Sequence, residues 1–218
     1  MPAGTGWFWL ALAGLGAFHG LNPAMGWLFA VALGLQEGRR AAVFKALPPI
    51  ALGHALSVAI VIAAVAGARL VIPLDAIRWG GGALLIAFGA RRVWRGGRHP
   101  RWVGMRVGAR DLVLWSFLMS SAHGAGLMLV PVLLRVPGPA HAEHGTPLVA
   151  GSAALPLGMA GAAIVVHTAA LLAVMTAVAV LVYETAGVDL LRRGWINLDL
   201  IWSVALIGAG VLTVVVTG

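Results

Sequence analysis

The sequence predicts an all-α polytopic membrane protein, with six transmembrane helices arranged as two inverted three-helix repeats. The composition is the first reason: 61% of the residues are hydrophobic, only 10% are charged, and the mean hydropathy is +0.96. A soluble domain carries about a quarter charged residues. The second reason is that long apolar segments alternate with short polar loops. The third is that similar features recur in the same order in both halves of the chain.

The first expected span has no Lys, Arg, Asp or Glu between Trp7 and Leu35. We expect it to be broken or kinked at Asn22-Pro23, because proline removes a helical hydrogen bond and clashes with the preceding turn. Pro48 and Pro49 are expected to open the second span, and Asp111 the fourth. The six spans, each near the roughly 20 residues that a bilayer needs, are expected at 7–35, 48–71, 77–94, 111–134, 159–183 and 196–216.

Basic residues predict the orientation of these spans. The first, third and fifth loops are much richer in Lys and Arg than the second and fourth, so the positive-inside rule places the odd loops in the cytoplasm and both termini outside. The chain is therefore expected in the cytoplasmic (inner) membrane. Because the net charge of +8 collects in these loops, it does not indicate nucleic-acid binding. The odd loops hold Arg39, Arg40, Lys45, Arg91, Arg92, Arg95, Arg98, Arg101, Arg106, Arg110, Arg192 and Arg193, and the even loops hold Arg69, Arg78 and Arg135.

The domain organisation expected is one transmembrane domain over residues 1–218, with repeat A at about 1–96, a basic cytoplasmic loop at about 91–110 and repeat B at about 111–218. Three features recur in order: a His-Gly pair, a lone histidine and a tryptophan. Each repeat has an odd number of spans, so the two would lie in opposite orientation, as in many secondary transporters. The recurring pairs are His19-Gly20 with His123-Gly124, His54 with His167, and Trp79 with Trp202.

Four histidines within the expected spans are the main candidates for a site. Polar groups are costly at membrane depth and are kept mainly where they face a cavity or a partner. Imidazole is a ligand for Zn, Ni, Co and Cu, and it also changes charge near neutral pH. The chain has no cysteine, which excludes thiolate ligands and disulfides. The predicted metal ligands are His19, His123, His54 and His167, as two pairs related by a pseudo-two-fold axis.

Other polar side chains near two of these histidines extend the predicted site. Met119 lies four residues before His123, on the same helical face, and Ser120 is next to it. Asn22 lies one turn after His19. We therefore expect a substrate site between the first and fourth spans, formed by His19, Asn22, Met119, Ser120 and His123. The alternative is that each histidine donates one N–H to a neighbouring helix and only holds the bundle together.

A second histidine motif lies in the fourth loop, as His141-Ala142-Glu143-His144. Its carboxylate and imidazoles would collect cations outside the membrane, but a solvated loop is the favoured interpretation of this short Pro/Gly-rich segment. There is no Ser/His/Asp order, Walker pattern or His-Glu-x-x-His motif, so we do not expect an enzyme.

Six short spans, a polar proline-containing break and a 3+3 plan resemble the lysine-exporter superfamily, which includes amino-acid exporters, nickel/cobalt exporters, and urease-accessory and sulfite-exporter-like proteins. The segment 21–29 (LNPAMGWLF) is similar to the Asn-Pro segment of the amino-acid exporters, although it lies here in the first span. His19 lies where the nickel/cobalt members begin a His-x4-Asp-His signature, whose Asp-His part is missing here. The resemblance implies a small exporter.

The predicted function is secondary transport, in the export direction, of a small solute. A divalent or soft metal cation ranks first as substrate, with Ni, Co, Zn or Cu as the candidates and no further cofactor. The alternatives are a proton-coupled exporter of an amino acid or small anion, and a non-transporting accessory subunit whose partner docks on the basic loop. The expected partners are the lipid bilayer and the solute, and a homodimer formed through the glycine-rich third and sixth spans is a further possibility.

Overall fold

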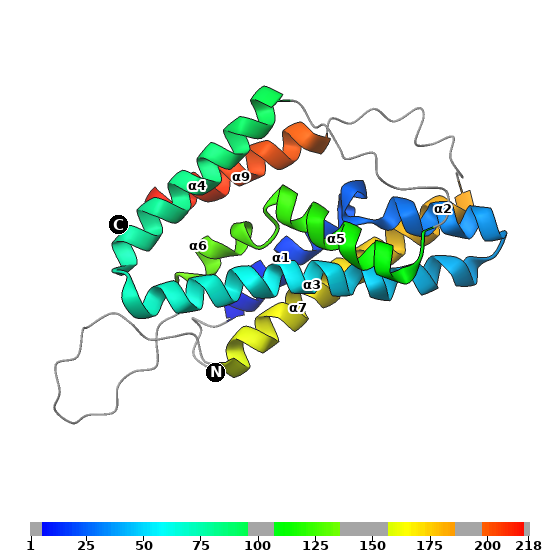
Figure 1. Cartoon of the computed structure of the whole chain (residues 1–218), viewed down its shortest axis with the longest axis horizontal. Helices are drawn as coiled ribbons and strands as arrows, with labels where there is room; N and C mark the ends of the chain where they lie inside the picture. Colours follow the sequence, from blue (N-terminus) through cyan, green and yellow to red (C-terminus); the bar gives the residue numbers. More distant parts are fainter. Residues whose placement is uncertain (1–5, 96–106, 136–156, 186–197, 216–218) are drawn as a thin grey trace.

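The computed structural model describes residues 6–95, 107–135, 157–185 and 198–215, and within them every regular element is a helix (Figure 1). The predicted all-α class is therefore confirmed for this part of the chain. The elements are α1 (Gly6–Leu21), η1 (Pro23–Met25), α2 (Trp27–Glu37), α3 (Arg40–Val71), α4 (Leu74–Arg95), α5 (Ala109–His123), η2 (Leu127–Leu129), α6 (Val130–Leu133), α7 (Leu157–Thr185) and α9 (Leu198–Val215).

Two of these helices, α3 and α7, are long and apolar enough to cross a membrane. A third candidate is α5 together with the segment Leu127–Leu133, a pair bent by 51°. The helices α1 and α2 are apolar but shorter, because the chain breaks between them. The structure thus supports a membrane protein with two or three spans by length and composition, while the prediction of six spans is not confirmed.

The break in the first expected span is confirmed at Asn22. Helix α1 ends at Leu21, and the Asn22 side chain accepts a hydrogen bond from the Ala24 N–H at 3.0 Å, which caps η1. Gly26 then adopts a φ of 123°, which favours glycine, and α2 begins. The indole N–H of Trp27 donates to the Leu21 carbonyl at 3.2 Å, so α2 is tied to the end of α1.

A matching break lies between α5 and α6, where the sequence predicted a continuous fourth span. Gly124 ends α5 with a φ of 70°, directly after His123. The Arg92 guanidinium donates to the Ala122 carbonyl at 2.9 Å and so connects α4 to this break. Both His-Gly pairs therefore lie at the end of a helix that stops inside the bundle.

The predicted start of the second span at Pro48 is wrong, since α3 begins at Arg40 and keeps both prolines in its interior. An interior proline costs about 3 kcal/mol of helix stability. The first turns of α3 offset this cost through Val43, Ala46 and Leu47, which are buried against apolar side chains of α2 and α7.

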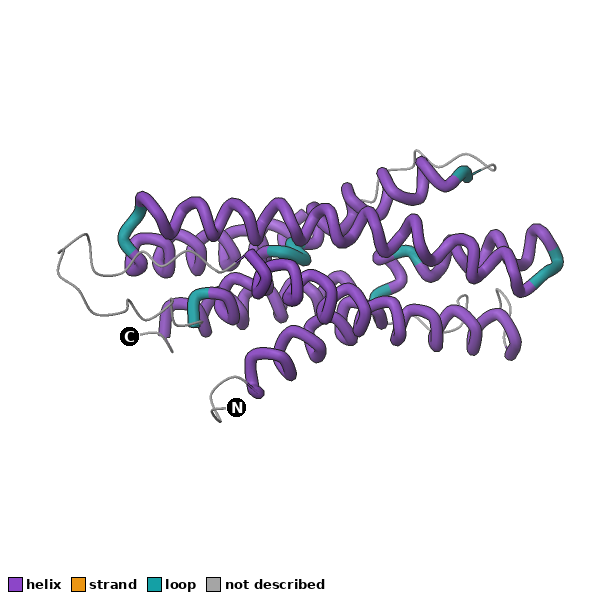
Figure 2. Tube along the Cα trace, turned by 90° about the horizontal axis from the view of Figure 1, so that it is seen from below, coloured by secondary structure: helices purple, strands orange, loops and turns teal. Residues whose placement is uncertain are grey.

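The helices pack in three long pairs: α1 with α7, α3 with α5, and α4 with α9. In Figure 1, α3 runs along the long axis of the bundle, and α4 and α9 lie together along one side of it, oblique to α3. Figure 2 shows the same helices after a turn of 90° about the horizontal axis. Gly16 of α1 faces the His167 carbonyl, and Gly20 faces the Leu171 carbonyl, so α1 and α7 run in the same direction.

Close contacts also give the relative directions of the helices in the other two pairs. The Ser116 hydroxyl contacts the Ile50 carbonyl, and the Ser120 hydroxyl contacts His54, so α3 and α5 also run in the same direction. Gly82 and Gly210 face each other's carbonyl oxygens between α4 and α9. Gly89 faces the Ser203 carbonyl, so this third pair is antiparallel.

These close approaches predict a sharp difference between glycines. A Cβ added at Gly16 or Gly53 would lie 2.2 Å from a carbonyl oxygen of the neighbouring helix, whereas one at Gly14 or Gly67 would meet nothing within 4 Å. We expect Gly16→Ala and Gly53→Ala to lower the free energy of unfolding by about 1–3 kcal/mol. Thermal unfolding in detergent, followed by circular dichroism, measures the effect.

The controls are Gly14→Ala on α1 and Gly67→Ala on α3, which should be neutral or stabilising by about 0.5–1 kcal/mol, because alanine is the better helix former. Equal melting temperatures for all four variants would contradict the close packing of α1 on α7 and of α3 on α5.

Candidate functional site

Three imidazoles meet in the centre of the bundle, each from a different helix. The ring centroid of His19 on α1 lies 5.4 Å from that of His54 on α3 and 5.1 Å from that of His167 on α7. The His54 and His167 rings are stacked, with centroids 5.3 Å apart. None of the three side chains is more than 1% exposed. The helix packing therefore collects three of the four predicted ligands into one buried cluster.

The direct contact within this cluster joins His54 and His167, whose Nε2 atoms are 3.2 Å apart. On its other side, His167 places Nδ1 3.1 Å from the Leu12 carbonyl oxygen of α1. His54 places Nδ1 2.9 Å from the Ser120 hydroxyl of α5. A continuous hydrogen-bonded chain thus links α5, α3, α7 and α1.

The two histidines of the His-Gly pairs share one local geometry. Nδ1 of His19 lies 2.6 Å from the Leu15 carbonyl oxygen, and Nδ1 of His123 lies 2.7 Å from the Met119 carbonyl oxygen. A carbonyl only accepts hydrogen bonds, so Nδ1 carries the hydrogen in both rings. In the neutral ring, Nε2 then presents a lone pair, which is the arrangement that metal-binding histidines use.

His123 belongs to the same buried region. Its side chain is 1% exposed, and it lies on α5 one turn after Ser120, whose hydroxyl contacts His54. The sequence predicted two symmetric pairs, with the site between the first and fourth spans. The ring contacts place His19 against His54 and His167, so the centre of the cluster also includes α3 and α7.

The remaining predicted site residues lie in the same region in different roles. The Asn22 side-chain oxygen is occupied by the Ala24 N–H in the cap of η1. Met119 holds His123 through its backbone carbonyl, and its side chain is buried. Ser120 has the most direct role, because its hydroxyl contacts His54 and lies 3.8 Å from the Met25 sulfur.

The predicted site did not include Met25, whose sulfur is a hydrogen-bond partner of Ser120. It also missed Ser116, whose hydroxyl donates to the Ile50 carbonyl at 2.7 Å, and the contact between the Ser57 and Ser121 hydroxyls at 3.0 Å. Helical spacing would have placed Ser116 on the same face of α5 as Ser120 and His123, because the three residues follow one another at intervals of four and three residues.

Apolar layers enclose the histidines on both sides. On α3, His54 lies one turn after Ile50, which belongs to one cluster of buried apolar side chains, and one turn before Val58, which belongs to a second such cluster. His167 lies in the same way between Leu171 and Ala163. A solute moving along the bundle would have to pass one apolar layer to reach the imidazoles and a second to leave them.

The ligand geometry for a metal ion is only partly present. Two nitrogen ligands at about 2.0–2.1 Å from a tetrahedral metal are roughly 3.3 Å apart, and the two Nε2 atoms of His54 and His167 match this spacing at 3.2 Å. Across the described ranges, however, no three or more His, Cys, Asp or Glu side chains are already arranged to hold a metal ion. Recruitment of a third nitrogen requires the rings to turn.

Acidic side chains do not contribute to the cluster within the described part of the chain. The carboxylates of Glu37, Asp75, Asp111 and Glu184 are exposed at helix ends. The motif at residues 141–144, for which a solvated loop was the favoured interpretation, lies outside the described residues.

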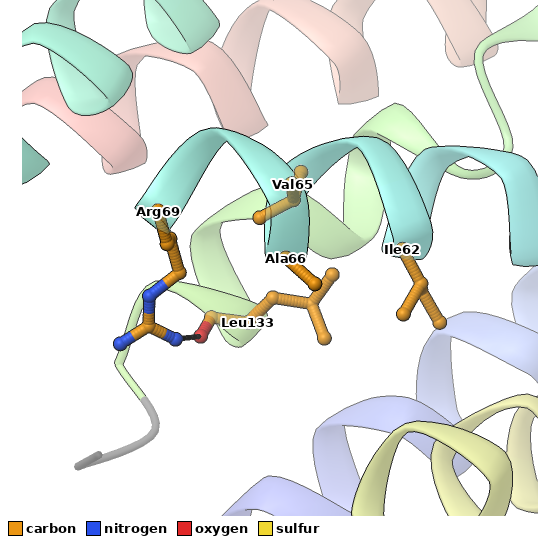
Figure 3. A pocket seen from close by; sticks show the side chains of 5 residues that line it. All are labelled: Ile62, Val65, Ala66, Arg69 and Leu133. Carbon is orange, nitrogen blue, oxygen red and sulfur yellow. Dashed lines mark hydrogen bonds between the residues drawn. The ribbon is translucent and has the colours of Figure 1, made fainter. Parts of the chain in front are cut away.

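A separate pocket lies away from the histidines, between α3 and α6 (Figure 3). It is lined by Ile62, Val65, Ala66, Arg69 and Leu133. Arg69 was expected in an outside loop, but it lies within α3, is 5% exposed and donates to the Leu133 carbonyl at 3.4 Å. Helix α3 ends at Val71, where the second span was expected to end, and Arg69 lies in its last turn.

No protein-family model, curated protein or solved structure matches this chain. The resemblance to the lysine-exporter superfamily therefore stays a prediction, and any functional proposal depends on the geometry of the histidine cluster.

Proposed function

We propose that this protein is a secondary carrier of the inner membrane that exports a late first-row transition-metal cation. In this proposal Nε2 atoms of the four buried histidines bind the cation, and His54 and His167 form the centre of the site. The observation that carries the proposal is the 3.2 Å separation of these two Nε2 atoms in a fully buried, apolar surrounding. Imidazole without carboxylate or thiolate suits Zn, Ni, Co and Cu.

The helix pairing supports the proposed six spans and the inverted repeat. If each chain segment crosses in turn, the first and fifth spans run in the same direction, as do the second and fourth, while the third and sixth are opposed. The pairs α1 with α7, α3 with α5, and α4 with α9 follow this pattern. A pseudo-two-fold axis in the membrane plane would exchange the first two pairs and map the third onto itself.

The ends of the broken helices favour a cation over an anion. His19 lies in the last turn of α1, and His123 is the last residue of α5. The C-terminal end of a helix carries partial negative charge, which stabilises a nearby cation. Broken helices whose ends meet a central site are a recurring feature of ion-coupled carriers.

The enclosing apolar layers give the proposal a transport mechanism. Opening the layer that contains Ile50 and Leu171 would expose the imidazoles to one side of the membrane, and opening the layer that contains Val58 and Ala163 would expose them to the other. The parallel pairs α1 with α7 and α3 with α5 carry both layers, so a relative movement of these pairs would open one layer while the other stays closed.

A second candidate is proton-coupled export of an amino acid or small anion. It is favoured by the hydrogen-bond geometry between His54 and His167 and by the lack, in the described ranges, of three converging metal ligands. In this function the imidazoles carry protons, and the solute binds elsewhere along the same path.

The proposed topology predicts on which side each connection lies. The chain has no cysteine, so single cysteines introduced at exposed positions report without background. Gly38 precedes α3, Ile72 follows it, and Gly108 follows α4 and precedes α5. In intact cells, we expect a membrane-impermeant maleimide to label Ile72→Cys from outside but not Gly38→Cys or Gly108→Cys.

Labelling of all three after the membrane is permeabilised is the control for reactivity, and the cysteine-free parent chain gives the background. If Ile72→Cys and Gly108→Cys react from the same side, α4 does not cross the membrane, and the six-span arrangement is wrong.

The proposed cation site predicts saturable metal binding. Calorimetric titration of the detergent-solubilised protein with Ni, Co, Zn and Cu should show binding of at least one of them. His54→Gln/His167→Gln should weaken it by at least about 100-fold, because loss of an outer-shell partner alone costs 10–100-fold. His141→Gln/His144→Gln, which removes the same number of imidazoles from the 141–144 motif, should bind like the parent.

An equal loss of metal affinity in the two double variants would contradict a metal site at the buried cluster. If the folded parent protein binds none of the four metals, the metal carrier is wrong and proton-coupled export becomes the better explanation.

A further inference from the structure

The Ser120 hydroxyl lies between two partners at the edge of the histidine cluster. Its oxygen is 2.9 Å from Nδ1 of His54 and 3.8 Å from the sulfur of Met25, and the side chain is completely buried. A hydroxyl has one hydrogen to donate and two lone pairs to accept with. Ser120 can therefore donate to only one of these two partners at a time.

The hydrogen positions follow from the chain of contacts that begins at Leu12. The Leu12 carbonyl only accepts, so Nδ1 of His167 carries a hydrogen and Nε2 of the neutral ring accepts. The contact of 3.2 Å between the two Nε2 atoms is then a hydrogen bond only if His54 carries its hydrogen on Nε2. Nδ1 of His54 is left as an acceptor, and Ser120 must donate to it.

Cation binding by Nε2 of His54 requires the other tautomer. The ring must give up its hydrogen at Nε2 and gain one at Nδ1, so it stays neutral, and water that enters when an apolar layer opens is the proton carrier for both steps. Nδ1–H of His54 then donates to the Ser120 oxygen. The Ser120 hydrogen, displaced from His54, turns to the Met25 sulfur, the second partner within reach. Each N–H of His54 and the O–H of Ser120 has an acceptor in the metal-free arrangement and in the cation-bound one.

We propose that Ser120 is a positioning residue that stabilises both tautomers of His54, so that the His54–His167 pair is either closed by its own hydrogen bond or open to a cation. This inference rests on the proposed metal site and assigns Met25 as the alternate acceptor. Ser120 acts through His54 and makes no contact with the cation itself.

The neighbouring serines do not have this arrangement. The Ser116 hydroxyl donates to the Ile50 carbonyl, and Ser57 and Ser121 contact each other. Ser116 is as buried as Ser120, lies one turn earlier on α5 and also contacts α3. It is therefore a matched control, because its loss removes a similar helix-to-helix bond without touching an imidazole.

The test is ¹⁵N NMR of histidine-labelled protein in lipid bilayers, with and without zinc. Ring nitrogen shifts distinguish the two tautomers, and the resonances that disappear in His54→Gln identify His54. We expect metal-free His54 to carry its hydrogen on Nε2 and zinc-loaded His54 to carry it on Nδ1. Ser120→Ala should lower zinc affinity by 10–100-fold, because the zinc-loaded ring would bury an unpaired Nδ1–H, whereas the metal-free ring would bury only an unpaired lone pair. Ser116→Ala and Ser120→Thr, which keeps the hydroxyl, should bind like the parent.

Two results would overturn the role of Ser120 while leaving the metal carrier intact: a metal-free His54 with its hydrogen on Nδ1, or equal zinc affinity for Ser120→Ala and Ser116→Ala. Lack of zinc, nickel, cobalt and copper binding by the parent protein is a different outcome. It would overturn the proposed function, and the inference about Ser120 would fall with it.

Discussion

The need to satisfy buried imidazoles in an apolar bundle is the constraint on which the arrangement depends. An unpaired polar group in such surroundings costs several kcal/mol, and each of the four histidines has an oxygen partner at Nδ1. For His54 and His167 that partner belongs to another helix, so two helix pairs must approach closely. Gly16 and Gly53 permit that approach. The same contacts leave the Nε2 atoms of His54 and His167 facing each other in the cluster, where the proposed chemistry takes place.

The two halves of the bundle use related solutions to build this centre. Each His-Gly pair ends a helix within the bundle, and each of these histidines bonds the carbonyl four residues earlier. The partners of His54 and His167 differ, however, because Ser120 serves one and the Leu12 carbonyl serves the other. This asymmetry makes His54 the ring whose tautomer can change, while a carbonyl fixes the tautomer of His167.

Sequence reasoning predicted the helical class and the break at Asn22-Pro23, and it selected the four histidines as candidate ligands in two pairs, because polar and proline residues are conspicuous in apolar segments. It did not predict that α3 continues through Pro48, since the compensating burial of Val43 and Leu47 depends on α2 and α7. The break at Gly124 was missed because glycine is common in membrane helices. The direct contact of His54 with His167 depends on the direction and register of α3 and α7, which residue spacing along the chain does not contain.

Metal flux through reconstituted protein tests the central claim most directly. Vesicles containing the purified chain and an entrapped metal-sensitive dye would be given zinc, nickel, cobalt or copper outside. The account predicts dye signal for at least one metal with the parent protein and with Ser116→Ala, and background signal with His54→Gln/His167→Gln. Flux that is the same in the double histidine variant and the parent would contradict a carrier whose site is the buried histidine cluster.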